Sequence, residues 1–167
     1  MKISEILSES KSADLYHGTS IEAAQEILES NSLQVGYGSA NEGNVSFTRS
    51  FGAAWEMYAG QNTIGVIFVF DQLKLSQKLG RKLRPFDWGG GTDEQEEASS
   101  VDIDNVSNYI KQIIVQHDTE ITEDDVDQFA LVFNDPRTVL ANRKNHRLNF
   151  ESTGRQFAMQ LKQNQQR

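Results

Sequence analysis

The sequence has no cysteine and only two prolines among its 167 residues. Disulfide bonds and thiolate metal sites are therefore excluded. No apolar stretch approaches the roughly 20 residues that a membrane helix requires, because the longest run, Ile64 to Phe70, has only the length of a strand. The first residues, Met1 to Leu7, lack the apolar core of a cleavable signal peptide. We therefore expect a cytoplasmic protein that does not enter a membrane.

Positive charge is scarce as well. Lysine and arginine number 16 against 24 acidic residues, which gives a net charge of −8 at pH 7. Contacts to phosphate groups need Lys and Arg, so this balance argues against a nucleic-acid partner. His117 and His146 are far apart and lack companion ligands, and the acidic residues of 120–127 lack the central glycine of a calcium loop. The sequence predicts no metal site.

The spacing of apolar and turn residues predicts one mixed domain of the α+β class. Ser20, Ser50 and Thr122 are the expected N-caps of helices. A long loop is expected from about Gly80 to Asp93, and long loops inside a domain are often functional. Strands are expected over 13–16, 33–35, 45–48, 66–70, 98–103 and 113–116, and helices from 21, from 51, over 105–111, 123–133 and 138–145.

Three parts of the chain are expected. Residues 1–12 form an N-terminal arm or short helix, and residues 13–150 form the domain. Residues 151–167 are a polar, basic C-terminal tail whose Gln-rich end frays.

A short run near the start, Leu15 to Ser20, predicts a strand that carries a histidine into a Gly-Thr turn. The ring of His17 can bind a ligand hydroxyl, and Gly18 lets a ligand approach the backbone closely. A second strand, Val45 to Arg49, follows with hydroxyl side chains at Ser46 and Thr48. An acidic cluster occupies residues 93–97.

In this order, the histidine, the hydroxyl-bearing strand and the glutamates resemble the ADP-ribosyltransferase superfamily, whose members use NAD. The resemblance covers roughly residues 13–116 and is similar in style to compact phage and bacterial members. It implies a split pair of small β-sheets with flanking helices and with NAD in the cleft between the sheets. The Ser-Phe-Thr strand resembles a subgroup that has arginine at the first position, where this chain has His17, so the chain looks hybrid.

The resemblance also implies roles for residues. Glu97 or Glu96 would stabilise the positive charge that builds on the ribose when nicotinamide leaves. Catalytic glutamates of the superfamily often have Glu or Gln two positions before them, and both candidates fit, with Gln95 before Glu97 and Glu94 before Glu96. Glu97 is preferred because it shares strand parity with Ser99, Val101 and Ile103. His17 would bond a ribose hydroxyl. The NAD-binding candidates are His17, Gly18, Thr19, Tyr37, Ser46, Thr48, Phe51 and Tyr58.

The function implied is NAD-dependent mono-ADP-ribosyl transfer to a protein or small-molecule acceptor, as in a phage or bacterial effector. The loop over 84–92 is expected to recognise the acceptor through Phe86 and Trp88, with Gln95 beside it, although both aromatic residues could instead pin the loop to the domain. Two alternatives remain open. One is a catalytically silent member of the fold that binds a nucleotide or a protein partner, and the other is an NAD glycohydrolase.

Overall fold

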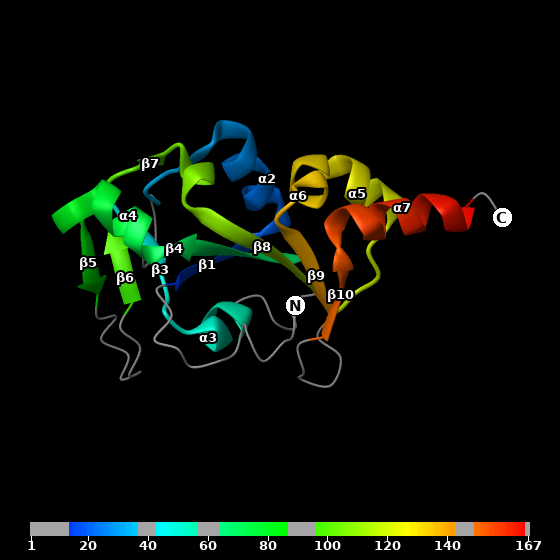
Figure 1. Cartoon of the computed structure of the whole chain (residues 1–167), viewed down its shortest axis with the longest axis horizontal. Coiled ribbons are helices and arrows are strands. Elements are labelled where there is room, and N and C mark those ends of the chain that lie inside the picture. The colour runs from blue at the N-terminus through cyan, green and yellow to red at the C-terminus, as the bar shows by residue number, and fades with distance from the viewer. Residues whose placement is uncertain (1–13, 37–42, 57–63, 87–95, 143–148, 166–167) are drawn as a thin grey trace.

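The computed structural model describes residues 14–36, 43–56, 64–86, 96–142 and 149–165, and it shows an α+β fold (Figure 1). The main sheet has five strands in the order β1-β4-β8-β9-β10. All neighbours are antiparallel except β8 and β9, which are parallel and are joined by a helical crossover. The strands are β1 (Asp14–Ser20), β4 (Gly65–Asp71), β8 (Ile110–His117), β9 (Thr138–Asn142) and β10 (Asn149–Thr153).

Two smaller sheets stand beside the main one. The first has the order β3-β6-β5, with β3 (Val45–Phe47), β6 (Glu96–Ser99) and β5 (Leu83–Phe86). The second pairs β2 (Ser32–Leu33) with β7 (Ile103–Asp104). A bridge between Tyr16 and Thr48, with backbone hydrogen bonds of 2.8 and 2.9 Å, joins β1 to the end of β3. The three-stranded sheet is therefore attached directly to the strand that carries His17.

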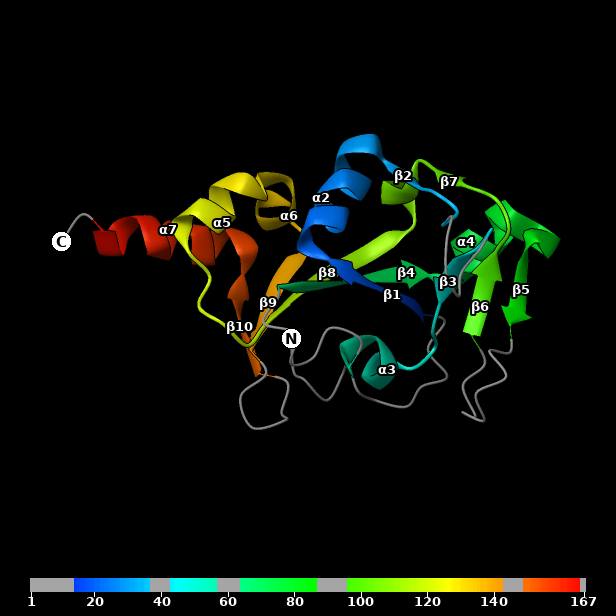
Figure 2. The same ribbon diagram turned by 180° about the vertical axis from the view of Figure 1, so that it is seen from behind.

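Helices cover both faces of the main sheet, as the two opposite views show (Figures 1 and 2). One face is covered by α2 (Ile21–Ser30), α5 (Glu123–Gln128), α6 (Ala130–Asn134) and α7 (Gly154–Gln165), and the other by α3 (Phe51–Glu56). Phe68 and Phe70 of β4 lie in the core under the first group, whereas Ile67 and Val69 lie in a second core with Trp55 of α3. This double burial explains why β4 is apolar without alternation. In the described ranges, no helix is long and apolar enough to cross a membrane.

The predicted helix starts are confirmed. The Ser20 hydroxyl accepts a hydrogen bond from the backbone N–H of Ala23 at 3.3 Å, and Ser50 accepts one from Ala53 at 3.2 Å. Thr122 and Asp125 form a reciprocal capping box, in which each side chain accepts from the other residue's backbone N–H. Such caps satisfy donors that the first turn of a helix leaves unpaired, so they depend on local sequence alone.

The predictions around the site need three corrections. β1 continues through Ser20, so His17 lies within a strand that pairs with β4 and is not followed by a turn. The predicted loop from Gly80 begins with a 3-10 turn, η2 (Gly80–Lys82), and then β5, which follows the unpredicted helix α4 (Gln72–Leu79). The predicted strand over 98–103 is two short strands, because β6 and β7 pair with different partners.

Three predicted helices also differ from the structure. Residues 105–111 hold only a 3-10 turn, η3 (Val106–Asn108), before β8 begins. The helix predicted over 123–133 breaks at Phe129, whose φ of −108° and ψ of 41° are not helical. The helix predicted over 138–145 is wrong, because Thr138 to Asn142 form β9. Parallel pairing with β8 overrides the local helix propensity there.

The C-terminal segment differs from a free tail where it is described. β10 pairs with β9, and α7 packs against α6, with Ala158 buried and the ring of Phe157 6.4 Å from that of Phe133. Helical geometry continues to Gln165. The predicted N-terminal arm over residues 1–12 lies outside the described residues.

Candidate functional site

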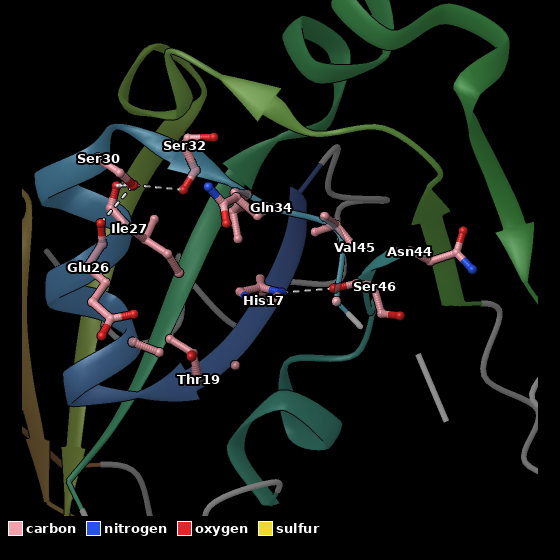
Figure 3. Close-up of a pocket in the computed structure, with 14 residues that line it drawn as sticks. His17, Thr19, Glu26, Ile27, Ser30, Ser32, Gln34, Asn44, Val45 and Ser46 are labelled. Atoms are coloured by element: carbon pink, nitrogen blue, oxygen red, sulfur yellow. Dashed lines mark hydrogen bonds between the residues drawn. The ribbon is translucent and has the colours of Figure 1, made fainter. Parts of the chain in front are cut away.

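A pocket of about 520 Å³ lies between β1, α2 and the chain that runs from β2 to β3 (Figure 3). Residues from segments far apart in sequence meet in it. Its lining consists of His17, Gly18 and Thr19 of β1, Ala23, Glu26, Ile27 and Ser30 of α2, Ser32, Leu33, Gln34 and Gly36 of the β2 segment, and Asn44, Val45 and Ser46 at β3.

His17 is the best-defined polar group in this pocket. Its Nδ1 lies 2.9 Å from the backbone oxygen of Ser46. Because a carbonyl oxygen can only accept, Nδ1 carries the hydrogen, and the neutral ring offers Nε2 as an acceptor. Burial lowers the pKa of His17, and the hydrogen bond to Ser46 only partly offsets this. The ring is therefore neutral at pH 7, and its tautomer is fixed by a residue 29 positions away.

The next two residues of β1 also line the pocket. Thr19 follows His17 by two positions, so both side chains lie on the same face of the strand. Thr19 is only 7% exposed, and its hydroxyl has no hydrogen-bond partner within the part of the chain that the structure describes. Gly18 lies between them and gives a ligand access to the backbone. The Thr19 hydroxyl is thus available to donate a hydrogen bond to a ligand in the pocket.

The strand that carries the predicted glutamates lies beside this pocket. In the β3–β6 pair, Ser46 is opposite Ala98 and Phe47 is opposite Glu97, with Glu96 at the next position. Paired strands lie about 4.8 Å apart. The histidine strand, the hydroxyl strand and the glutamate strand are thus consecutive neighbours in space. The backbones of Glu96 and Glu97 are described, whereas their side chains lie outside the described part of the structure.

The argument from parity in favour of Glu97 does not hold. It assumed one strand from Ala98 to Ile103, but β6 ends at Ser99, so Val101 and Ile103 do not share its pleat. In the register, Glu96 has the parity of Ala98 and therefore of Ser46, whereas Glu97 has the parity of Phe47. The backbone alone leaves both glutamates as candidates.

Other predicted residues lie elsewhere. Thr48 forms the bridge to Tyr16, and its hydroxyl accepts a hydrogen bond from the Ser50 backbone N–H at 3.0 Å. Phe51 packs on Tyr16 and Trp55 on the α3 side of the main sheet, with ring centroids 5.6 and 5.9 Å away. Neither Thr48 nor Phe51 is among the described residues that line the pocket. Tyr37, Tyr58, Trp88 and Gln95 lie outside the described residues, as does the side chain of Phe86 in β5.

The sequence analysis missed the contribution of α2 and β2. Ala23, Glu26, Ile27 and Ser30 follow the spacing i, i+3, i+4, i+7, which marks one face of a helix. The sequence predicts an apolar face of this helix at Ile21, Ala24, Ile27 and Leu28, which includes Ile27 but not the polar residues Glu26 and Ser30 of the pocket. The i, i+3, i+4, i+7 spacing of these residues is the sequence signal for this wall, because residues at that spacing share one face of a helix.

No group of three or more His, Asp or Glu residues that could hold a metal is found among the described ranges. A scan against protein-family models and searches of curated protein sequences and of solved structures found no match to this chain. The case for a function therefore depends on the pocket and on the sequence motifs.

Proposed function

We propose that this protein is an NAD-dependent mono-ADP-ribosyltransferase with the pocket at His17 as its NAD site. One observation carries the proposal. The His17 ring is bonded to Ser46 inside the pocket, and the strand of Ser46 pairs with the strand of Glu96 and Glu97. The three segments that resemble the superfamily in sequence order are thus adjacent in space. The two larger sheets, joined at Tyr16 and Thr48, are also compatible with its split-sheet fold.

The β1 residues bind the nicotinamide-ribose half of NAD. Nε2 of His17 accepts a hydrogen bond from a ribose hydroxyl, while Ser46 holds the ring through Nδ1. Gly18 lets the nicotinamide amide approach the backbone. The fixed tautomer matters because a ring with the hydrogen on Nε2 could not accept from the same hydroxyl.

A carboxylate on β6 supplies the catalytic electrostatics. The bond between C1′ of the ribose and the nicotinamide nitrogen breaks, and nicotinamide leaves with the bonding electrons. Positive charge develops on the sugar, as in glycoside hydrolysis, and the carboxylate of Glu97 or Glu96 stabilises it. The acceptor then forms a bond to C1′ and releases its proton to a base, for which the same carboxylate is the candidate.

The segment between β5 and β6 provides acceptor recognition in this proposal. In the sequence it connects the edge strand β5 to β6, the strand of the two glutamates. The acceptor is a protein or a small molecule. The setting we propose is the cytoplasm, with the chain acting as a phage or bacterial effector.

The test combines binding, bond cleavage and transfer. NAD is titrated into the purified protein by calorimetry, nicotinamide release is measured by chromatography, and NAD labelled in the adenylate is incubated with the protein and a host lysate. A labelled acceptor is the expected result. Nicotinamide release without a labelled acceptor would indicate a glycohydrolase, and binding without release would indicate a silent member of the fold. Failure of NAD to bind would contradict the proposal.

A further inference from the structure

The α2 wall of the pocket has an uneven distribution of charge. Glu26 is the one charged side chain among the described residues that line the pocket, and no Lys or Arg is among them. Figure 3 shows its carboxylate on the same side of His17 as Thr19, away from Ser46. Within the described part of the chain, the Glu26 side chain has neither a hydrogen bond nor an ion pair. This wall offers an unpaired acceptor and no cation.

The two ends of the pocket differ in chemistry. His17 lies between α2 on one side and β3 on the other, and β6 with its two glutamates lies beyond β3 (Figure 3). If the bond that breaks is next to β6, as the proposed function requires, the nicotinamide-ribose half occupies the β3 side. The adenosine half of the dinucleotide then extends along α2, towards Glu26 and Thr19.

We propose that Glu26 determines dinucleotide specificity by binding the free 2′- and 3′-hydroxyls of the adenosine ribose and by rejecting a 2′-phosphate. This inference rests on the proposed function. An ionised carboxylate only accepts hydrogen bonds, which suits two ribose hydroxyls. A phosphate offers no donor there and brings negative charge next to Glu26, with no cation on the described walls to offset the repulsion. The site therefore takes NAD in preference to NADP.

The neighbouring hydroxyls support this assignment. Thr19 is buried and has an unpartnered hydroxyl within the described residues, so it can donate to the ligand beside Glu26. Ser30, one helical turn further, already donates to the backbone oxygen of Glu26 at 2.8 Å. The carboxylate of Glu26 can thus accept from a ribose diol beside the Thr19 hydroxyl, whereas it has no donor to offer a phosphate.

The same helix offers a matched control. Glu29 is an exposed glutamate three residues after Glu26, and it is not among the pocket-lining residues. Glu26→Gln and Glu29→Gln each remove one negative charge from α2 and leave the length of the side chain unchanged. A general effect of helix charge would appear in both variants, whereas a local contact to the ribose would appear only in Glu26→Gln.

The experiment measures the dissociation constants of NAD and NADP by calorimetry for the wild type and both variants, at 50 mM and 500 mM NaCl. We expect NADP to bind the wild type roughly tenfold or more weakly than NAD at low salt. Glu26→Gln should reduce the ratio to less than about threefold, and Glu29→Gln should keep it. High salt should also reduce the wild-type ratio, because salt screens the repulsion between carboxylate and phosphate.

Equal binding of NAD and NADP to the wild type would overturn this inference and leave the proposed function standing. A ratio that persists in Glu26→Gln would also overturn it, because discrimination would then come from other residues. Failure of the wild type to bind either dinucleotide would contradict both the inference and the proposed function.

Discussion

Two regions of the main sheet differ in whether their polar side chains are paired within the protein. Along β1, His17 and Thr19 line a pocket, and the Thr19 hydroxyl has no partner among the described residues. Where α6 leads into β9, polar groups are paired within the chain. Arg137 contacts Asp135 at 2.7 and 2.9 Å and donates to the backbone oxygen of Ser107 at 2.9 Å, and the Thr138 hydroxyl donates to a buried carbonyl at 2.6 Å.

This difference suggests that the β1 region serves ligand binding and that the α6–β9 region serves the stability of the fold. Polar groups that line a pocket without a partner in the chain are available to a ligand, which gains free energy when it pairs them. In the α6–β9 region, Arg137, Asp135 and the Thr138 hydroxyl already pair with each other or with the backbone. Substitutions at the first region should therefore alter ligand use, and substitutions at the second should alter unfolding.

The largest effect is expected at the glutamates of β6. Replacing the catalytic one of Glu97 and Glu96 by Gln should lower turnover by roughly 10²–10³, by analogy with the loss of an electrostatic group that stabilises a transition state. NAD affinity should change little, since the charge on the sugar develops only in the transition state. The Gln variant at the other of the two positions should be milder. Nicotinamide release and NAD calorimetry measure the two quantities, and equal turnover in wild type and both variants would favour a silent binder.

The next largest effect is expected in the α6–β9 region, where α7 packs closely. Gly154 begins α7, and a Cβ there would collide with the backbone oxygen of Phe133 and stand 3.0 Å from Cγ2 of Thr138. Gly154→Ala should therefore lower the free energy of unfolding by about 1–3 kcal/mol. Gly52→Ala is the matched control, because its Cβ would be 3.6 Å from the Ser50 hydroxyl, an ordinary contact, within helix α3.

Urea denaturation measures both glycine variants. Gly52→Ala should be neutral or stabilising by up to about 1 kcal/mol, since alanine is the better helix former. An equally stable Gly154→Ala variant would show that α7 shifts freely and that the close packing at Phe133 contributes nothing.

A smaller effect concerns Asp135 and its pH dependence. Burial alone would raise the pKa of Asp135, but the hydrogen bonds and charge of Arg137 hold it below the ordinary value. A lowered carboxyl pKa gives stability that is present above the unfolded-state pKa near 3.9 and is lost as pH falls. Asp135→Asn should cost about 1–2 kcal/mol at pH 7 and flatten the loss of stability below about pH 4.

Urea denaturation at pH 7, 5 and 3 measures the free energy of unfolding of the wild type and Asp135→Asn. Asp127→Asn is the control, because Asp127 pairs with Lys162 on the exposed surface at 3.3 Å and should contribute less than about 0.5 kcal/mol. The prediction fails if the Asp135 and Asp127 variants lose stability equally on acidification.

The smallest effect is expected at His17. His17→Gln should weaken NAD binding by about 0.5–1.5 kcal/mol, the contribution of one hydrogen bond, while the fold survives. Burial lowers the pKa of His17, so the stability that depends on its neutral ring is present above about pH 6.5 and is lost as pH falls through the folded-state value. Protonation also removes the acceptor at Nε2, so NAD affinity should fall over the same range.

Calorimetry between pH 7.5 and 5 compares the wild type with His17→Gln. The variant should show a flatter dependence of NAD affinity on pH. Unfolding of the variant at pH 7 would show that His17 belongs to the core and not to recognition.

The sequence correctly predicted features that depend on residues close together in the chain, such as helix caps and apolar runs. The caps at Ser20, Ser50 and Thr122 begin helices as expected, because each cap bonds a backbone group three residues away. The continuous apolar run of β4 identified a strand buried on both faces. Of the eight predicted NAD-binding residues, Thr48 and Phe51 do not line the pocket and Tyr37 and Tyr58 lie outside the described residues. The other four line it: His17, Gly18, Thr19 and Ser46.

Long-range pairing decided what the sequence could not. Residues 138–142 are a strand because β8 offers a parallel partner, and residues 83–86 are a strand because β6 pairs with them. Glu26 lines the pocket because the face of α2 that contains Ala23, Glu26, Ile27 and Ser30 lies towards β1 and β2. The order of residues thus determined the α+β class, the helix starts and the histidine motif, all of which depend on local bonds and periodicity. The tertiary structure alone decided the tautomer of His17 and the walls of its pocket, because those depend on contacts between residues far apart in the chain.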